Sequence, residues 1–242
     1  MTTTESFIAH LLELRTRLLH SAVALLLVFI ALFPWAANLY TWLAHPLLAK
    51  LPKGAQMIAT DVTTPFFVPL KVAMMAAFLI ALPYILYQVW RFVAPGLYAH
   101  EKRLVWPLIM ASTVLFFCGM TFAYFIVFPV VFGFITASAP QGVAVMTDID
   151  KYLSFVLGMF MAFGVTFQVP VAVVVLVRMG LVTVEKLRDI RRYVIVGAFV
   201  VGAVFTPPDV VSQLMLAMPL WLLYEVGIVV ASWIKKPEMS AA

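Results

Sequence analysis

Six stretches of mostly apolar residues set the tightest limit on what this chain can fold into. They lie at about 21–40, 67–90, 104–128, 152–177, 193–205 and 210–232. A helix needs about 20 apolar residues, at about 1.5 Å of rise each, to cross about 30 Å of hydrocarbon. The first four reach that length, whereas the fifth has 13 residues and the sixth is interrupted by Glu225. We therefore predict an all-α membrane protein, a single transmembrane domain over residues 1–242 with six transmembrane helices.

The composition supports a membrane class and argues against a soluble one. Hydrophobic residues make up 64% of the chain and charged residues 11%, which is too few charges to cover the surface of a soluble fold. The net charge of +5 raises the question of nucleic-acid binding. The charges, however, lie in short loops between apolar stretches, as in proteins anchored beside anionic lipid. We expect membrane lipid as a partner and no nucleic acid.

The lysines and arginines predict the orientation of the spans. Twelve of the 16 lie in the N-terminal segment, the 91–103 loop, the 178–192 loop and the C-terminal tail. Of the other four, Lys50 and Lys53 lie between the first and second spans, Lys71 lies near the start of the second span, and Lys151 lies between the third and fourth. Because cytoplasmic loops carry the excess of positive charge, both termini are expected in the cytoplasm. Residues 5–20 carry polar and apolar residues on opposite arcs, which predicts an N-terminal amphipathic helix in the membrane interface.

Common catalytic and metal-binding motifs do not occur in the sequence. It contains no phosphate-binding G-x-x-x-x-G-K-[ST] loop, no H-E-x-x-H and no G-x-S-x-G. The four histidines fall at loop or interfacial positions without a paired spacing. We expect no catalytic residue, no metal site and no cofactor.

Polar residues within or beside the apolar stretches are candidates for function. Gln168 lies near the middle of the fourth stretch, where it either holds helices together by a hydrogen bond or forms a polar spot in a groove. Glu225 in the sixth stretch is either an interfacial carboxylate or a functional one. Asp209, after two prolines, suits the free N–H groups at a helix start. Glu101 and Glu13, by composition alone, are solvated charges.

Six strings of the sequence resemble the TatC family, the large membrane subunit of the twin-arginine protein translocase. They are HLLELRTRL at 10–18, MIATDVTTPFF at 57–67, YQVWRFVAPGLYAHEKR at 87–103, FAYFIVFPVVFGF at 122–134, YLSFVLGMFMAFGVTFQVPV at 152–171 and FTPPDVVSQ at 205–213. They occur in the family's order and extend over nearly the whole chain.

The resemblance implies a concave, glove-like receptor of six helices in the bacterial cytoplasmic membrane. It implies binding of twin-arginine signal peptides on folded cargo, assembly with the single-span subunits TatB and TatA and with other TatC copies, and transport driven by the protonmotive force. The family positions that receive the twin arginines match Glu13, Phe92 and Glu101. Carboxylates facing the cytosol suit this task on physical grounds, because they accept charge-assisted bonds from guanidinium groups.

Two further sites follow from the same resemblance. The family carries a Glu, sometimes a Gln, on its concave face at mid-membrane, and Gln168 matches it without offering a titratable group. Polar residues that help dock TatB and TatA match Thr206 and Gln213. The other hypothesis from the residues is a small-molecule or ion transporter that uses Gln168 and Glu225 as a midplane site.

Overall fold

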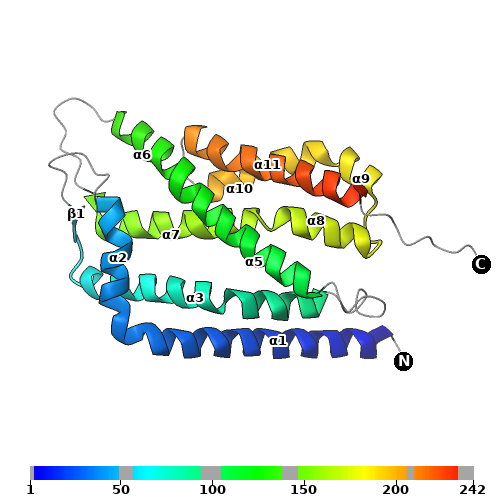
Figure 1. Cartoon of the computed structure of the whole chain (residues 1–242), viewed down its shortest axis with the longest axis horizontal. Coiled ribbons are helices and arrows are strands. Elements are labelled where there is room, and N and C mark those ends of the chain that lie inside the picture. The colour runs from blue at the N-terminus through cyan, green and yellow to red at the C-terminus, as the bar shows by residue number, and fades with distance from the viewer. Residues whose placement is uncertain (1–2, 49–56, 94–104, 138–146, 206–209, 234–242) are drawn as a thin grey trace, which may run out of the picture. The chain divides into compact units, whose positions relative to one another are not determined.

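The computed structural model describes residues 3–48, 57–93, 105–137, 147–205 and 210–233, and nearly all of them are helical (Figure 1). The helices are α1 (Thr3–Leu32), α2 (Ala36–Leu48), α3 (Thr64–Val93), α5 (Val105–Phe122), α6 (Phe128–Ala137), α7 (Ile149–Thr166), α8 (Val169–Arg178), α9 (Val184–Asp189), α10 (Arg191–Phe205) and α11 (Val210–Trp233). A 3-10 turn, η1 (Phe33–Trp35), joins α1 to α2, and a π-helical turn, η3 (Ala123–Val127), joins α5 to α6. Two short strands, β1 (Met57–Ile58) and β2 (Thr147–Asp148), complete the described elements.

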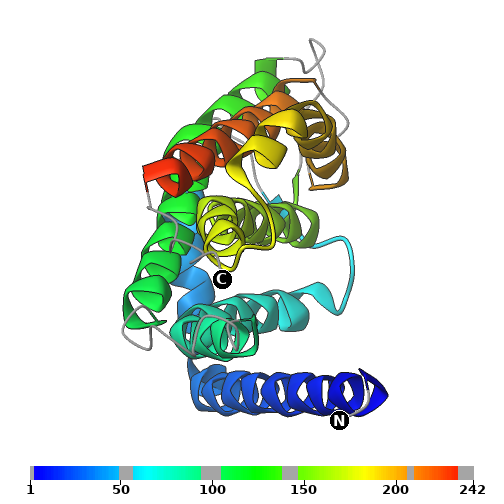
Figure 2. The ribbon, with the colours of Figure 1, turned by 90° about the vertical axis from the view of Figure 1, so that its right-hand side faces the viewer.

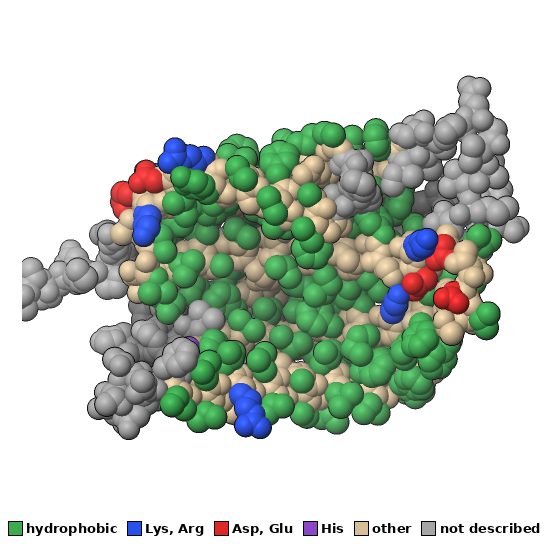
Figure 3. Space-filling view, turned by 180° about the vertical axis from the view of Figure 1, so that it is seen from behind, with side chains coloured by type: hydrophobic (Ala, Val, Ile, Leu, Met, Phe, Trp, Pro, Cys, Tyr) green, Lys and Arg blue, Asp and Glu red, His purple; other side chains and the backbone are tan. Residues whose placement is uncertain are grey.

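Five helical stretches of the described chain are long and apolar enough to cross a membrane. They are His10–Leu43, Thr64–Phe92, Trp106–Phe134, Ile149–Arg178 and Val210–Trp233. Helix α10 has 15 residues, so it extends only about 22 Å, as short as the sequence indicates for the fifth apolar stretch. Figure 3 shows hydrophobic side chains over most of the visible surface, as helices that face lipid require.

The chain folds into two compact units. Unit 1 comprises residues 1–113 and 141–157, and unit 2 comprises residues 114–140 and 158–242. In unit 1, α1 and α3 lie side by side, and α2 packs on α3 (Figures 1 and 2). In unit 2, α11 packs against α8 and α10. One buried cluster in this unit consists of Val173, Val177, Leu187, Tyr224, Ile228 and Ala231.

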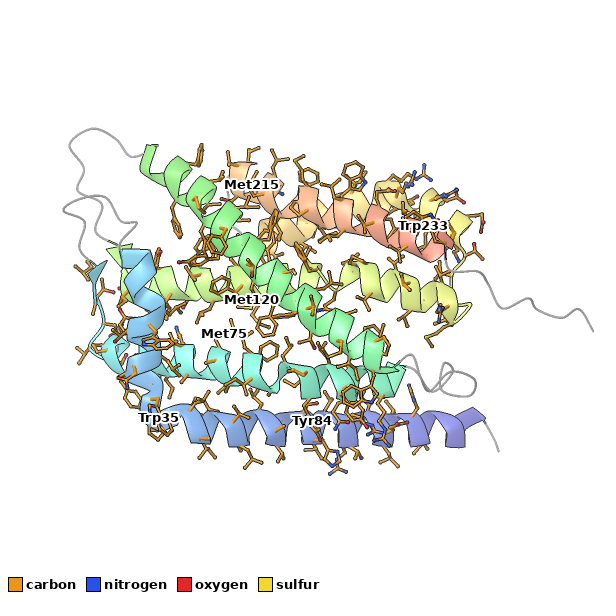
Figure 4. The ribbon with its side chains drawn as sticks, viewed as in Figure 1. Trp35, Met75, Tyr84, Met120, Met215 and Trp233 are labelled. Atoms are coloured by element: carbon orange, nitrogen blue, oxygen red, sulfur yellow. The ribbon has the colours of Figure 1, made fainter. Side chains whose placement is uncertain are left out.

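The N-terminal segment is not a separate helix, which corrects the expectation for residues 5–20. Helix α1 runs unbroken from Thr3 to Leu32, because no glycine or proline separates the amphipathic residues from the apolar run. The break comes instead at Pro34, whose missing N–H and fixed ring end the helix. Figure 4 shows Trp35 at the corner where α2 begins. The span expected at 21–40 is therefore divided between two helices.

The third apolar stretch is also longer than the sequence indicates. The sequence predicts a span over 104–128, yet α6 continues the helix to Ala137. Pro129 lies just after the π-helical turn. A wider turn accommodates the proline ring and its missing N–H without ending the helix.

The segment before α3 and the segment before α7 are joined in unit 1. Strands β1 and β2 pair in parallel, with Met57 opposite Thr147. The Thr60 backbone N–H donates to Asp148 Oδ2 over 3.2 Å, and the Thr60 hydroxyl donates to the same oxygen. Lys71 Nζ lies 2.6 Å from Asp150 Oδ1. These contacts connect two segments that the sequence places far apart.

We expect this connection to weaken in acid. The hydrogen bond from Thr60, followed by that from the Lys151 backbone N–H, lowers the pKa of Asp148 from 3.8 to about 2. Because the folded pKa is lowered, the stabilisation is complete above about pH 4 and is lost as the pH falls through about 2. The difference in melting temperature between the wild type and Asp148→Asn should be constant from pH 6 to 4 and should shrink towards pH 2. A difference that does not change with pH would contradict the prediction.

Candidate functional site

The N-terminal part of α1 and the C-terminal part of α3 lie together in unit 1. The two helices are antiparallel, and the His10 ring stacks on the Phe92 ring with centroids 4.4 Å apart and planes 18° from parallel. About two helical turns further along α1, Arg17 reaches Gln88 on α3. Two of the residues expected to bind a signal peptide, Glu13 and Phe92, are thus at the same end of one helix pair. The third, Glu101, lies outside the described residues.

Arg17 divides its guanidinium between the two helices. One terminal nitrogen donates to Glu13 Oε1 over 3.1 Å, and the other donates to Gln88 Oε1 over 3.2 Å. Glu13 and Arg17 are one helical turn apart on α1, the spacing that places such pairs side by side. Gln88 is 4% exposed, so its amide is a fixed anchor. The Glu13 side chain, 37% exposed, remains open to solvent.

A buried hydrogen bond holds this end of α3 in place. Trp90 Nε1 donates to the Ser112 hydroxyl on α5 over 2.9 Å, and both residues are buried. On the exposed side, Arg91 donates to the Tyr87 hydroxyl over 2.9 Å. A partly exposed carboxylate and a half-buried aromatic ring at the same end of a helix pair fixed in this way can receive a cation that has an apolar flank.

Gln168 lies at the break between α7 and α8 in unit 2. Its backbone N–H donates to the Val165 carbonyl over 2.9 Å, and its own carbonyl accepts from Ala172 over 2.9 Å. Pro170 follows at the second position of α8, where a proline is tolerated because first-turn N–H groups lack helical partners. The residue therefore ends one helical segment and begins another, and its side chain is partly exposed.

Glu225 forms an ion pair. Its Oε2 lies 2.6 Å from a terminal nitrogen of Arg191, at the start of α10. The neighbouring Tyr224 hydroxyl donates to the Leu187 carbonyl of α9 over 2.8 Å. Glu225 therefore ties α11 to the start of α10, and its charge is already balanced by a cation of the same chain.

The hairpin of α10 and α11 contains one of the expected docking residues within the described chain. Gln213 Nε2 donates to the Phe199 carbonyl on α10 over 2.9 Å, so the amide joins the two helices of the hairpin. Thr206 and Asp209 lie outside the described residues.

Sequence reasoning missed the neighbours of Glu13. The sequence places His10 and Arg17 with Glu13 on the polar arc of residues 5–20, but it does not indicate that Arg17 binds Glu13, that His10 stacks on Phe92 or that Gln88 takes part. The spacing of four residues between Glu13 and Arg17 was visible in the sequence and is the signal that could have identified the pair. Gln88 on α3 could not be found in this way, because the packing of α1 against α3 is a feature of the tertiary structure.

Sequence comparison finds close relatives along most of the chain. The profile of the family described as Sec-independent protein translocase protein (TatC) matches residues 9–219. The chain is 54% identical to the Sec-independent protein translocase protein TatC of Azotobacter chroococcum mcd 1, over 97% of this chain and 92% of that protein. It is 53% identical to the TatC protein of Escherichia coli K12, over 93% of this chain and 87% of that protein.

Two solved structures are similar to this fold. A crystal structure of the twin arginine translocase receptor TatC is 41% identical in sequence, with a TM-score of 0.82 over 93% of this chain and 98% of that chain. A second crystal structure of the receptor, in the detergent DDM, has a TM-score of 0.83 at 41% identity, over 92% of this chain and 99% of that chain.

Proposed function

Because the chain belongs to the TatC family of Sec-independent protein translocases, we propose that it is the signal-peptide receptor and core subunit of a twin-arginine translocase. In this role it binds the consecutive arginines of signal peptides on folded cargo. With TatB and TatA it exports that cargo across the bacterial cytoplasmic membrane, using the protonmotive force. The observation that most supports the proposal is the open carboxylate of Glu13 beside the helix end that carries Phe92.

The chemistry of this pair suits a signal peptide. A carboxylate accepts charge-assisted hydrogen bonds from a guanidinium, and an aromatic ring offers a surface for the apolar part of the peptide. Two adjacent arginines are best received by two carboxylates. We propose Glu101, in the segment that follows α3, as the second one.

The membrane topology belongs to the same proposal. We propose six spans in a concave, glove-like bundle, with α10 as the short fifth span and both termini in the cytoplasm. The distribution of lysine and arginine supports this orientation. With the N-terminus in the cytoplasm, Glu13 lies on the side of the membrane where signal peptides arrive.

Peptide binding to the purified full-length chain in detergent tests the proposal. A labelled peptide with two consecutive arginines should bind, and the same peptide with two lysines should bind much more weakly, because an ammonium cannot form the paired bonds of a guanidinium. Equal binding of the two peptides would refute the receptor role. It would favour the alternative of a small-molecule or ion transporter. Of the two residues in that hypothesis, Glu225 is already paired with Arg191, so Gln168 would be the residue left to bind the transported molecule.

We expect Gln168 to matter more for transport than for recognition. Gln168→Glu should retain export, since the family accommodates either residue, whereas Gln168→Leu should reduce export because a polar group is lost at the α7–α8 break. Export of a folded cargo and peptide binding should be measured on the same preparation. Equal losses in both assays for Gln168→Leu would mean that the amide is needed for the fold.

The hairpin of α10 and α11 is the proposed docking surface for TatB and TatA. Helix α11 is long enough to span, but α10 is not, and the mismatch of α10 with the bilayer is one that a single-span partner helix can cover. Thr206 and Gln213 are the proposed contacts, and Asp209 lies between them in the sequence. Gln213 already donates to Phe199, so in this proposal its side-chain carbonyl oxygen is the group that a partner would meet. Other copies of the chain are proposed as further partners.

A further inference from the structure

The carboxylate proposed to receive an arginine already carries one from its own chain. A terminal nitrogen of Arg17 donates to Glu13 Oε1 over 3.1 Å. A signal peptide would bring the same chemical group to the same oxygen atoms. Two guanidinium groups on one carboxylate repel each other, and each weakens the hold of the other. The resting contact therefore competes with the proposed ligand.

Arg17 is held at this position by more than the ion pair. Its side chain is 18% exposed, and its other terminal nitrogen donates to the buried amide of Gln88. An exposed side chain leaves its partner at little cost in free energy, whereas a side chain held by a second hydrogen bond does not. The guanidinium therefore remains near Glu13 until another group displaces it.

The docked arginine is nevertheless incompletely satisfied. Its Nε is buried and meets no hydrogen-bond acceptor among the described residues. A buried N–H without a partner raises the free energy of the docked state. Arg17 is thus held firmly enough to occupy Glu13 and loosely enough to be exchanged.

We propose, on the basis of the proposed receptor function, that Arg17 is a built-in counter-ion of Glu13 that sets the affinity and the selectivity of the site. An incoming arginine replaces one guanidinium with another, so it must form better bonds to the carboxylate than Arg17 does. An incoming lysine offers an ammonium that cannot form paired bonds, and it therefore competes poorly. Arg17 lowers affinity for every cationic ligand and lowers it most for ligands without a guanidinium.

The test measures peptide binding by full-length variants in detergent. Arg17→Gln removes the charge and keeps a polar side chain. It should bind the two-arginine peptide about two- to tenfold more tightly, because the lost competing contact is worth more than a screened ion pair and less than a charge-assisted hydrogen bond. Its preference for arginine over lysine should fall. Arg17→Lys keeps the charge but offers only an ammonium to Glu13 and Gln88, so its affinity should lie between those of the wild type and Arg17→Gln. Arg15→Gln removes the same charge from an exposed position on the same helix and should change affinity by less than about twofold.

The outcomes distinguish the role of Arg17 from the receptor role. Unchanged or weaker binding by Arg17→Gln, in protein with a wild-type melting temperature, overturns the inference and leaves the receptor role standing. An equal gain from Arg15→Gln also overturns it, because general charge would then be the cause. If Arg17→Gln does not fold, Arg17→Met is measured in its place with the same expected gain. A wild type that does not prefer arginine peptides refutes the receptor role and, with it, the role of Arg17.

Discussion

Replacing Gly119 with alanine should severely destabilise unit 2. A Cβ atom at this position would lie 2.5 Å from the Phe163 carbonyl oxygen and 2.9 Å from its carbonyl carbon, both in the backbone of α7. Backbone atoms in a packed helix cannot move aside as a flexible side chain can. Overpacking of this kind costs about 1–3 kcal/mol or more. We expect a lower melting temperature in detergent and a smaller yield of folded protein.

A matched glycine on the partner helix provides the control. A Cβ added at Gly158 on α7 would meet no atom within 4 Å. Gly158→Ala should therefore keep or raise the melting temperature, since alanine favours a helix over glycine by about 0.5–1 kcal/mol. The same melting temperature for both variants would show that the close approach of α5 and α7 does not limit stability.

Gly164 on α7 provides a variant with an intermediate expected loss of stability. At Gly164, the clash is with the Phe116 ring, 2.4 Å from the added carbon. A ring can turn where a backbone cannot, so Gly164→Ala should cost less than Gly119→Ala. Small residues on both helices allow close contact, a common way for membrane helices to associate where lipid weakens the hydrophobic drive.

The positions of the long helices could be predicted from the sequence because a span is a local property. Length and hydropathy locate Thr64–Phe92 to within three residues and Val210–Trp233 to within one. The ends of other helices could not be predicted, because proline has opposite effects in different places. Pro34 ends α1, whereas Pro129 lies within a continuing helix after a π-helical turn. The outcome depends on neighbouring turns and packing, which residue type alone does not specify.

The candidate site was only partly predictable for a related reason. The resemblance identified Glu13 and Phe92, which lie on the helix pair α1 and α3. The state of these residues depends on their partners: Arg17 donates one terminal nitrogen to Glu13 and the other to Gln88, and the His10 ring stacks on Phe92. Ion pairs between helices depend on the tertiary structure. The pairing of Glu225 with Arg191, 34 positions apart, likewise depends on the fold, and the sequence does not indicate it.

Reversing the charge of Glu13 should nearly abolish binding of a two-arginine peptide. Glu13→Lys removes the carboxylate and places a second cation beside Arg17, so the site would repel the ligand it is proposed to receive. The loss of hydrogen bonds to a charged group, worth about 1.5–3 kcal/mol, predicts a decrease in affinity of about 10- to 100-fold, and repulsion adds to it. Glu13→Gln keeps an acceptor oxygen without the charge and should lose less.

The control for this experiment is a carboxylate at another exposed position. Glu185 on α9 is exposed, and Glu185→Lys changes the net charge by the same amount. If only the charge at Glu13 matters, Glu185→Lys should change affinity by less than about twofold, because salt screens exposed charges that do not contact the ligand. The measurement is a titration of labelled peptide into each purified variant, with melting temperature as the check on folding. Loss of binding in both variants would assign the effect to overall charge. Normal binding by a folded Glu13→Lys would remove Glu13 from the recognition site, and the receptor role would then depend on Glu101 alone.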